Sequence, residues 1–290
     1  MKLLARGHTI EWPRQPLVMG IVNLSVDSFS GDGVVDVNDA LEKAREMISD
    51  GADIIDIGAE SARTNRGPIS EEVEASLLTQ FIERWPEVVE SGDAVSPVLL
   101  SVNTWRPSVA RKAIECGGHI FNDISALPTE ENAQICADTG AALLIMHSVG
   151  EPKVAHAHIG YEDVMAQIES FFMEKIALAE RAGVRREALI LDPGIDFAKQ
   201  RGDNLRIYRE LDHLAQFGRP ILLPVSRKTV IGEVLGIADP ASRDAGTVAC
   251  IVHGMLRGAA IFRVHNVRAA VLTVRMIHAL EGPNLTHVIV

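Results

Sequence analysis

The sequence predicts an α/β fold, a (β/α)8 TIM barrel, and three observations support this prediction. Short apolar runs rich in Ile, Val and Leu alternate with longer amphipathic segments along the 290 residues. The apolar runs are continuous, which is typical of parallel strands covered on both faces. No Ser/Gly-rich linker or change in composition divides the chain, so we expect one domain over residues 1–290, with an N-terminal arm at 1–16 and a C-terminal tail at 281–290.

The expected elements follow one another in strand–helix order. The predicted strands are Leu17–Leu24, Asp53–Ile57, Val98–Val102, His119–Phe121, Ala141–Met146, Ala188–Leu191, Pro220–Val225 and Ala260–Val264. The predicted helices are Val37–Ser49, Glu71–Glu90, Pro107–Glu115, Glu130–Thr139, Tyr161–Ala182, Asn204–Gln216, Arg243–Arg257 and Val267–Leu280. An open, doubly wound sheet is the main alternative. Its dinucleotide-binding form is disfavoured because no GxGxxG motif follows the first strand.

Composition excludes several classes of protein. The 28 basic and 39 acidic residues give a net charge of −11, which argues against a general nucleic-acid or membrane-surface binder. Cys116, Cys136 and Cys250 lie far apart without a CxxC pair, which indicates reduced thiols rather than a zinc site or disulfide framework. The N-terminus does not resemble a signal peptide and no run of 18 apolar residues occurs, so we expect a soluble, cytoplasmic protein.

Polar or charged residues stand where nearly every predicted strand ends. In a barrel of this kind the carboxyl ends of the strands meet at one mouth, where substrates bind. Each residue alone could cap a helix or serve the fold, but their convergence favours a functional site. The residues are Asn23, Asp56, Glu60–Arg63, Asn103, Asn122, Asp123, His147, Asp192, Ser226, Arg227, Lys228, Arg263 and His265.

The chemistry of this set suggests two kinds of recognition. Asn103, Asn122 and Asp192 offer donors and acceptors suited to the edge of a heterocycle. The cationic members, namely Arg63, Arg227, Lys228, Arg263 and His265, suit phosphate oxygens. No Ser-His-Asp arrangement or zinc-hydrolase motif occurs in the sequence. We therefore expect catalysis by positioning and charge stabilisation, with a leaving group that departs readily.

Motifs at each strand end resemble, in order, those of the dihydropteroate synthase family. They are IVNLSVDSFSGDG (21–33), GAESARTNRGPIS (58–70), SVNTWRPSVARKA (101–113), HIFNDISAL (119–127), IMHS (145–148), LDPGIDFAK (191–199), VSRKTVIGE (225–233) and RVHNV (263–267). The resemblance implies a transferase of folate biosynthesis. Such an enzyme condenses 6-hydroxymethyl-7,8-dihydropterin diphosphate with p-aminobenzoate to give 7,8-dihydropteroate and diphosphate. It also implies Mg²⁺ as a cofactor and a homodimer.

The resemblance also implies roles for individual residues. Asn23 would hold Mg²⁺ and the diphosphate, together with the loop that contains Asp27 and Phe29. Arg63, Arg263 and His265 would bind the diphosphate. The pterin would contact Asn122, Asp192, Lys228 and Met146, while Arg227 and Thr229 would lie towards the aminobenzoate. Ala62 and Phe197 complete the expected substrate contacts, and Asp192, Lys228 and Asn103 are the candidate catalytic residues.

The sequence departs from the family pattern beside the pterin, in the first loop and, most of all, at the amine end of the site. Asn103 stands where Asp is usual, Ala62 where Thr is usual, and Asp196 and Ala198 replace two glycines, while Val26 replaces a proline. Asp196 is expected to bring a negative charge near a substrate carboxylate. Two alternatives therefore stay open. One is a pterin-binding paralogue that is inactive or uses another amine; the other is a methyltetrahydrofolate-binding methyltransferase domain, which has little use for the cationic residues.

Overall fold

A computed structural model describes residues 1–24, 36–60, 67–89, 97–150, 154 and 159–282. Eight parallel strands form the sheet, in the order β8-β7-β6-β5-β4-β3-β10-β9. Their bounds are β3 (Leu17–Asn23), β4 (Ile54–Gly58), β5 (Leu99–Thr104), β6 (Ile120–Asp123), β7 (Ala142–Met146), β8 (Leu189–Asp192), β9 (Leu222–Pro224) and β10 (Ile261–Val264). A parallel bridge between Leu191 and Ile221 joins the two end strands. The predicted TIM barrel is confirmed.

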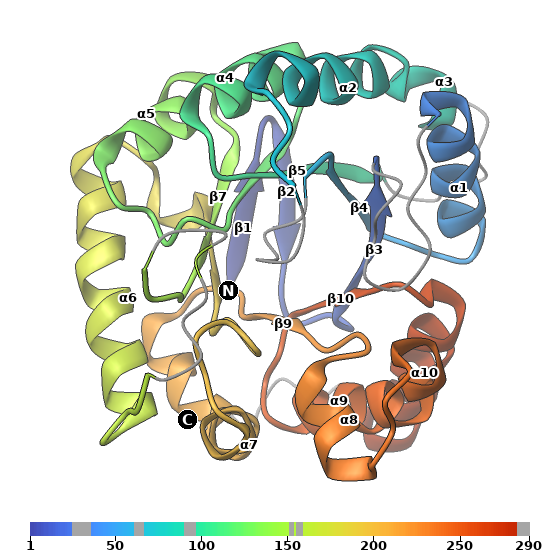
Figure 1. Ribbon diagram of the computed structural model, residues 1–290, viewed down its shortest axis with the longest axis vertical. Coiled ribbons are helices and arrows are strands. Elements are labelled where there is room, and N and C mark those ends of the chain that lie inside the picture. Colours follow the sequence, from blue (N-terminus) through green and yellow to red (C-terminus); the bar gives the residue numbers. More distant parts are fainter. Residues whose placement is uncertain (25–35, 61–66, 90–96, 151–153, 155–158, 283–290) are drawn as a thin grey trace.

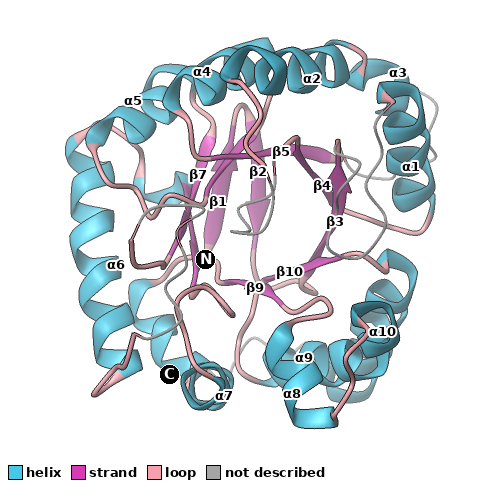
Figure 2. Cartoon of the chain, in the orientation of Figure 1, coloured by secondary structure: helices cyan, strands magenta, loops and turns pink. Residues whose placement is uncertain are grey.

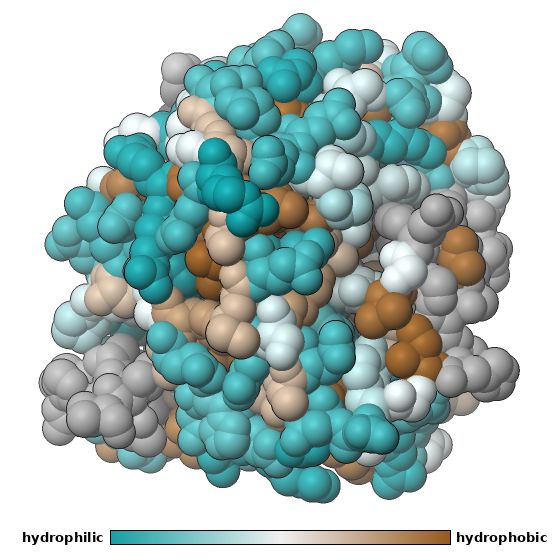
Figure 3. All heavy atoms as spheres, turned by 90° about the vertical axis from the view of Figure 1, so that its left-hand side faces the viewer, coloured by the Kyte–Doolittle hydropathy of each residue, from teal (hydrophilic) through white to brown (hydrophobic). Residues whose placement is uncertain are grey.

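Helices surround the sheet on its outer face (Figures 1 and 2). They are α1 (Val37–Ser49), α2 (Glu71–Glu83), α3 (Trp85–Val89), α4 (Pro107–Cys116), α5 (Glu130–Thr139), α6 (Val164–Arg181), α7 (Arg201–Arg209), α8 (Thr229–Leu235), α9 (Asp244–Leu256) and α10 (Val267–Glu281), with 3-10 turns η1 (Arg186–Ala188), η2 (Leu211–Phe217) and η3 (Pro240–Arg243). On the side of α5 and α6, hydrophilic residues cover most of the surface (Figure 3). Among the described helices, none has both the length and the apolar character that crossing a membrane requires.

Two predicted helices differ from the structure, and one helix was not predicted. The single helix expected at Glu71–Glu90 divides at Arg84, because Pro86 lacks the N–H that would continue the hydrogen-bond ladder; Glu90 lies outside the described residues. The helix expected at Asn204–Gln216 begins earlier, as α7, and its second half is the 3-10 turn η2. Helix α8 was not predicted, because its seven residues are too few for a clear helical period.

The N-terminal arm is an antiparallel hairpin of β1 (Lys2–Ala5) and β2 (His8–Glu11). Leu3 and Ala5 are buried against residues at the starts of the barrel strands, so the hairpin closes the N-terminal end of the barrel. The Arg6 guanidinium donates to carbonyl oxygens at the end of α4, namely those of Ile114, Glu115 and Gly118. A cation at a helix C-terminus is favourable. The hairpin leaves the opposite end of the barrel for substrates.

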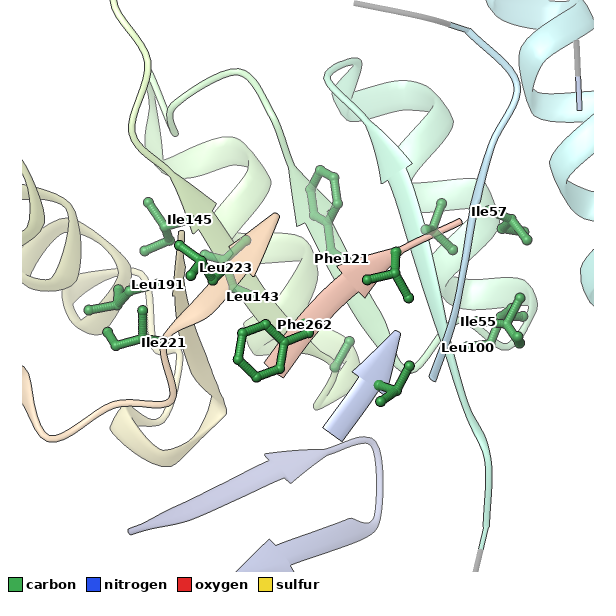
Figure 4. Close-up of a cluster of buried hydrophobic side chains, with 14 of the residues drawn as sticks. Ile55, Ile57, Leu100, Phe121, Leu143, Ile145, Leu191, Ile221, Leu223 and Phe262 are labelled. Atoms are coloured by element: carbon green, nitrogen blue, oxygen red, sulfur yellow. The ribbon is translucent and has the colours of Figure 1, made fainter. Parts of the chain in front are cut away.

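Alternation along the strands separates two apolar layers. Outward side chains pack between sheet and helices, as Figure 4 shows for Ile55, Leu100 and Phe262 among others. Inward side chains such as Met19 and Leu144 fill the barrel centre. Successive strand residues point to opposite faces. Further along the inner face, near the strand ends, most strands carry a polar residue two or four positions beyond this apolar layer. These residues, namely Asn23, Asp56, Asn103, Asn122, Asp192 and Arg263, lie around one mouth.

Candidate active site

Asp56 is the centre of a hydrogen-bond network inside the barrel. Its carboxylate has no solvent exposure. Arg263 Nε lies 2.7 Å from Oδ2, Ser101 Oγ donates to Oδ1 at 2.6 Å, and Asn122 Nδ2 donates to Oδ1 at 3.1 Å. The Arg263 guanidinium balances a buried charge that would otherwise be costly. Since the Asn122 nitrogen is used here, its amide oxygen is the atom that can accept from a ligand.

Asp192 ends β8 with 4% of its surface exposed. Burial raises the pKa of this carboxyl to about 6, although the Gly194 amide, Lys228, Lys199 and Arg263 all oppose the rise. The Gly194 N–H donates to Oδ1 at 2.7 Å, which fixes the carboxylate. A side chain at position 194 would place its Cβ 1.9 Å from the His147 carbonyl oxygen, so this turn requires glycine. Asp192 is a fixed acceptor that titrates near neutral pH.

Lys199 is a buried amine that the sequence analysis did not single out. Its Nζ lies 2.9 Å from His147 Nδ1 and donates to the carbonyl oxygens of Gly194 and Phe197 at 3.0 Å each. Burial lowers the pKa of Lys199 to about 7. Burial, together with the nearby charge of Lys199, lowers the pKa of His147 well below its usual value. His147 is therefore a neutral, structural acceptor. The signal in the sequence was the lysine that ends the LDPGIDFAK motif at residues 191–199.

Lys228, at the start of α8, contacts the loop of residues 193–199 that follows Asp192. Its Nζ donates to the Ile195 carbonyl oxygen at 2.7 Å and lies 5.2 Å from the centre of the Phe197 ring. Met146 is the register partner of Asp192 on the neighbouring strand β7 and is buried in the inner layer. The structure thus brings Met146, Asp192, Phe197 and Lys228 together. The Asp196 carboxylate accepts hydrogen bonds from the backbone of α8 with both of its oxygens.

His265 and Arg227 lie together just after the ends of β10 and β9. His265 Nδ1 is 2.7 Å from Ser226 Oγ, and Arg227 Nε is 2.8 Å from Asp244 Oδ1. Both side chains line a groove of about 320 Å³ that also includes Lys43 of α1. The structure therefore places Arg227 beside His265. That Arg227 lies towards the aminobenzoate stays a prediction.

Asn23 and Asn103 are half-buried at the ends of β3 and β5. Within the described part of the chain, neither amide side chain makes a hydrogen bond. Asn103 pairs in register with Asn122, so the two amides lie side by side at the mouth. Of the remaining predicted site residues, Ala62 and Arg63, like Asp27 and Phe29, lie outside the described residues.

Arg106 forms an ion network that the sequence analysis also missed. Its Nη1 contacts Glu74 and lies 2.6 Å from Glu60 Oε2, and both carboxylates are buried. Nη2 donates to the Ile69 carbonyl oxygen at 3.1 Å. Burial raises the pKa of Glu74, against the hydrogen bonds from Thr104 and Arg106. Arg106 therefore anchors both flanks of the segment that carries Arg63.

Acidic and metal-binding side chains are sparse at the mouth. Among the described residues there is no group of three or more His, Cys, Asp or Glu that could hold a metal ion. Asn23 is the predicted metal ligand that the structure describes, and it offers one amide oxygen. A divalent cation here would need oxygen atoms from its substrate and water.

Comparisons with known proteins agree with this geometry. Residues 19–265 match the family described as "Pterin binding enzyme". The chain is 38% identical over 280 residues to dihydropteroate synthase of Escherichia coli (strain K12), covering 96% of each chain, and 38% identical over 284 residues to that of Bacillus subtilis (strain 168), covering 97% and 94%. Its structure is similar to Yersinia pestis dihydropteroate synthase with a sulfonamide drug complex (TM-score 0.87, 35% identity, 97% and 99% covered). It is also similar to Thermus thermophilus dihydropteroate synthase in complex with 4-aminobenzoate (TM-score 0.84, 35% identity, 97% and 100% covered).

Proposed function

Because this chain belongs to the family of pterin-binding enzymes, we propose that it catalyses the dihydropteroate synthase reaction. In that reaction the amine of p-aminobenzoate displaces diphosphate from 6-hydroxymethyl-7,8-dihydropterin diphosphate. The observation that carries the proposal is the buried Asp192 at the mouth, with Lys228, Lys199 and Arg263 acting on its charge. A fixed carboxylate among cations suits a heterocycle with N–H donors and a phosphorylated arm.

The pterin ring would lie on the inner layer at the end of β8. Asp192 accepts hydrogen bonds from the ring's N–H groups, and the Asn122 oxygen accepts a further one. Lys228 donates to the ring's carbonyl oxygen, while buried Met146 packs against the ring face. These groups are held by bonds to the protein before the substrate arrives, at Gly194 for Asp192 and at Asp56 for Asn122. Preorganised groups of this kind need little reorganisation during the reaction.

The diphosphate would bind beside Arg263 and His265. Nε and Nη2 of Arg263 are directed at Asp56, each 2.7 Å from its Oδ2. Nη1 has no hydrogen-bond partner among the described residues, and it would donate to a phosphate oxygen. His265 is oriented by the contact between its Nδ1 and Ser226 Oγ, and its imidazole would contribute positive charge or a hydrogen bond to the diphosphate. As the C–O bond breaks, its electron pair leaves with the diphosphate. Positive groups fixed at that point stabilise the departing charge more than the ground state.

Mg²⁺ would enter with the diphosphate. The Asn23 amide fits such an ion because it is a hard oxygen donor at a strand end, without a hydrogen-bond partner among the described residues. Mg²⁺ usually keeps several waters and binds through substrate phosphates and few protein ligands. When bound, the ion would supply charge neutralisation for the leaving group.

We further propose that the protein is a cytoplasmic homodimer. Three apolar side chains on α10, Leu272, Met276 and Leu280, are more than half exposed and recur every four residues. Val234 and Leu235 of α8 are also exposed. An apolar stripe of this kind is typical of a protein interface. The described cysteines are unpaired, as a reducing compartment requires. Sedimentation of the wild type and of Met276→Glu would test the dimer, which the variant should dissociate.

Incorporation of labelled p-aminobenzoate into dihydropteroate by the purified protein tests the reaction itself. Product is expected with the pterin diphosphate and none from Asp192→Asn. A protein that binds the pterin diphosphate in calorimetry but forms no product would be the paralogue, or would use another amine. Binding of methyltetrahydrofolate in place of the pterin diphosphate would favour the methyltransferase alternative.

A further inference from the structure

Asp196 connects two loops of the mouth through its carboxylate. Oδ2 accepts a hydrogen bond from the Thr229 amide, and Oδ1 accepts from the Val230 amide at 3.3 Å. These amides are the first two of α8, so the carboxylate caps this helix from a distant part of the chain. Lys228 Nζ donates back to the Ile195 carbonyl oxygen at 2.7 Å. Three hydrogen bonds therefore join residues 195–196 to residues 228–230.

Asp196 is itself fixed by Asn204, which is almost fully buried. The Asp196 amide donates to Asn204 Oδ1 at 2.9 Å, and Asn204 Nδ2 donates to Asp196 Oδ1 at 3.3 Å. This reciprocal pair holds Asp196 at a φ of +68°, a left-handed conformation that residues other than glycine rarely adopt. Strained backbone persists where its surroundings fix it, commonly at functional sites.

The loop that carries Lys228 is held from its other side as well. Arg227 has a φ of +55°, its amide donates to Thr247 Oγ1 at 3.0 Å, and its carbonyl oxygen accepts from Arg243 Nη1 at 3.1 Å. The backbone on both sides of Lys228 is therefore fixed. Thr247 and Arg243 hold residue 227, and Asp196 holds residues 229 and 230. Of these contacts, the cap by Asp196 comes from the loop that also carries Asp192.

We propose that Asp196 is a positioning residue for the synthase reaction: by capping α8 it holds Lys228 in place to contact the pterin beside Asp192. This inference rests on the proposed function. Without the carboxylate, the start of α8 loses two acceptors and Lys228 loses its fixed backbone. Displacement of a reacting group by about 1 Å can cost 10²-fold in rate.

Asp196→Ala tests the proposal, with Asp163→Ala as a matched control. Asp163 also caps a helix with its carboxylate, because its Oδ1 accepts from the amides of Met165 and Ala166 at the start of α6, at 3.0 Å each. Both variants lose a helix cap. We expect Asp196→Ala alone to speed hydrogen exchange at the Thr229 and Val230 amides and to weaken pterin diphosphate binding about tenfold. Asp196→Asn, which keeps one acceptor oxygen, should restore part of the affinity.

The pH dependence of kcat/KM gives a readout that lost stability alone would not move. Lys228, Lys199 and Arg263 are the cations that act on Asp192. If Lys228 withdraws, the pKa of Asp192 rises above about 6, so the acid limb of the profile should shift to higher pH in Asp196→Ala.

Two results would overturn the role of Asp196. One is unchanged exchange and affinity in Asp196→Ala; the other is an equal loss of affinity in Asp163→Ala. A wild type that makes no dihydropteroate would refute the proposed reaction instead. The exchange and calorimetric measurements would still test the positioning role in that case, because neither depends on turnover.

Discussion

Replacing Asp192 with Asn should make the protein more stable at neutral pH while removing its affinity for the pterin diphosphate. The carboxyl is buried, and burial raises its pKa from 3.8 to about 6. Asn has the same shape and can still accept the Gly194 amide bond, but it carries no charge. The variant should therefore escape the cost of an ionised group at the end of β8.

The magnitude follows from the pKa. A rise of about two pH units corresponds to about 3 kcal/mol, since each unit is worth about 1.4 kcal/mol. Between pH 4 and 6 the folded wild type binds more protons at Asp192 than the unfolded chain does, so its stability falls as pH rises through this window. Well below pH 3.8 both states are protonated and the cost is absent. Above about pH 6 the cost is fully present.

Urea unfolding of both proteins at pH 4, 5, 6 and 7 measures the difference. The stability of Asp192→Asn relative to the wild type should rise by about 2–3 kcal/mol across this range, with most of the change between pH 4 and 6. Loss of the Asp192 carboxylate also lowers the pKa of Lys199 below about 7. This second change likewise makes the stability of the variant, relative to the wild type, rise with pH. A difference that stays constant with pH, or falls, would refute the electrostatic assignment of Asp192. Retained affinity for the pterin diphosphate would exclude it from the site.

Three further predictions concern other parts of the molecule. Arg263→Met should destabilise the protein by about 3–5 kcal/mol, because Asp56 is left buried without a countercharge; Asp56→Asn in the same chain should recover much of this in urea unfolding, and a fully stable single variant would contradict the network. Asn103→Asp should raise the single-turnover rate, by up to about 10²-fold, with little change in pterin affinity, because a carboxylate stabilises the developing cation more than an amide does; equal rates would reject it. Arg6→Met should lower the unfolding free energy by about 1 kcal/mol through the lost contact with the end of α4, and synthase activity should not change, since the hairpin lies at the opposite end of the barrel.

Much of the architecture could be read from local patterns. Continuous apolar strands such as Ala142–Met146 must be covered on both faces, which requires parallel strands with helices outside. The strand-end positions of Asn103, Asn122 and Asp192 follow from the same periods, because inward and outward side chains alternate. Where the period was short or interrupted, the prediction was wrong or incomplete, as at α8 and at Pro86.

The pairing of the polar groups was decided by the tertiary structure. Asp56 and Arg263 are 207 residues apart, and barrel closure alone brings them into contact. Whether a carboxylate faces a ligand or a neighbour depends on such distant partners: Asp192 stays available at the mouth, whereas Asp196 caps α8. The sequence by itself determined which residues line the mouth, because side chains alternate every two residues along a strand and repeat every 3.6 residues along a helix. The tertiary structure decided which of their atoms are already bonded, because those bonds join strands and loops that no local pattern relates.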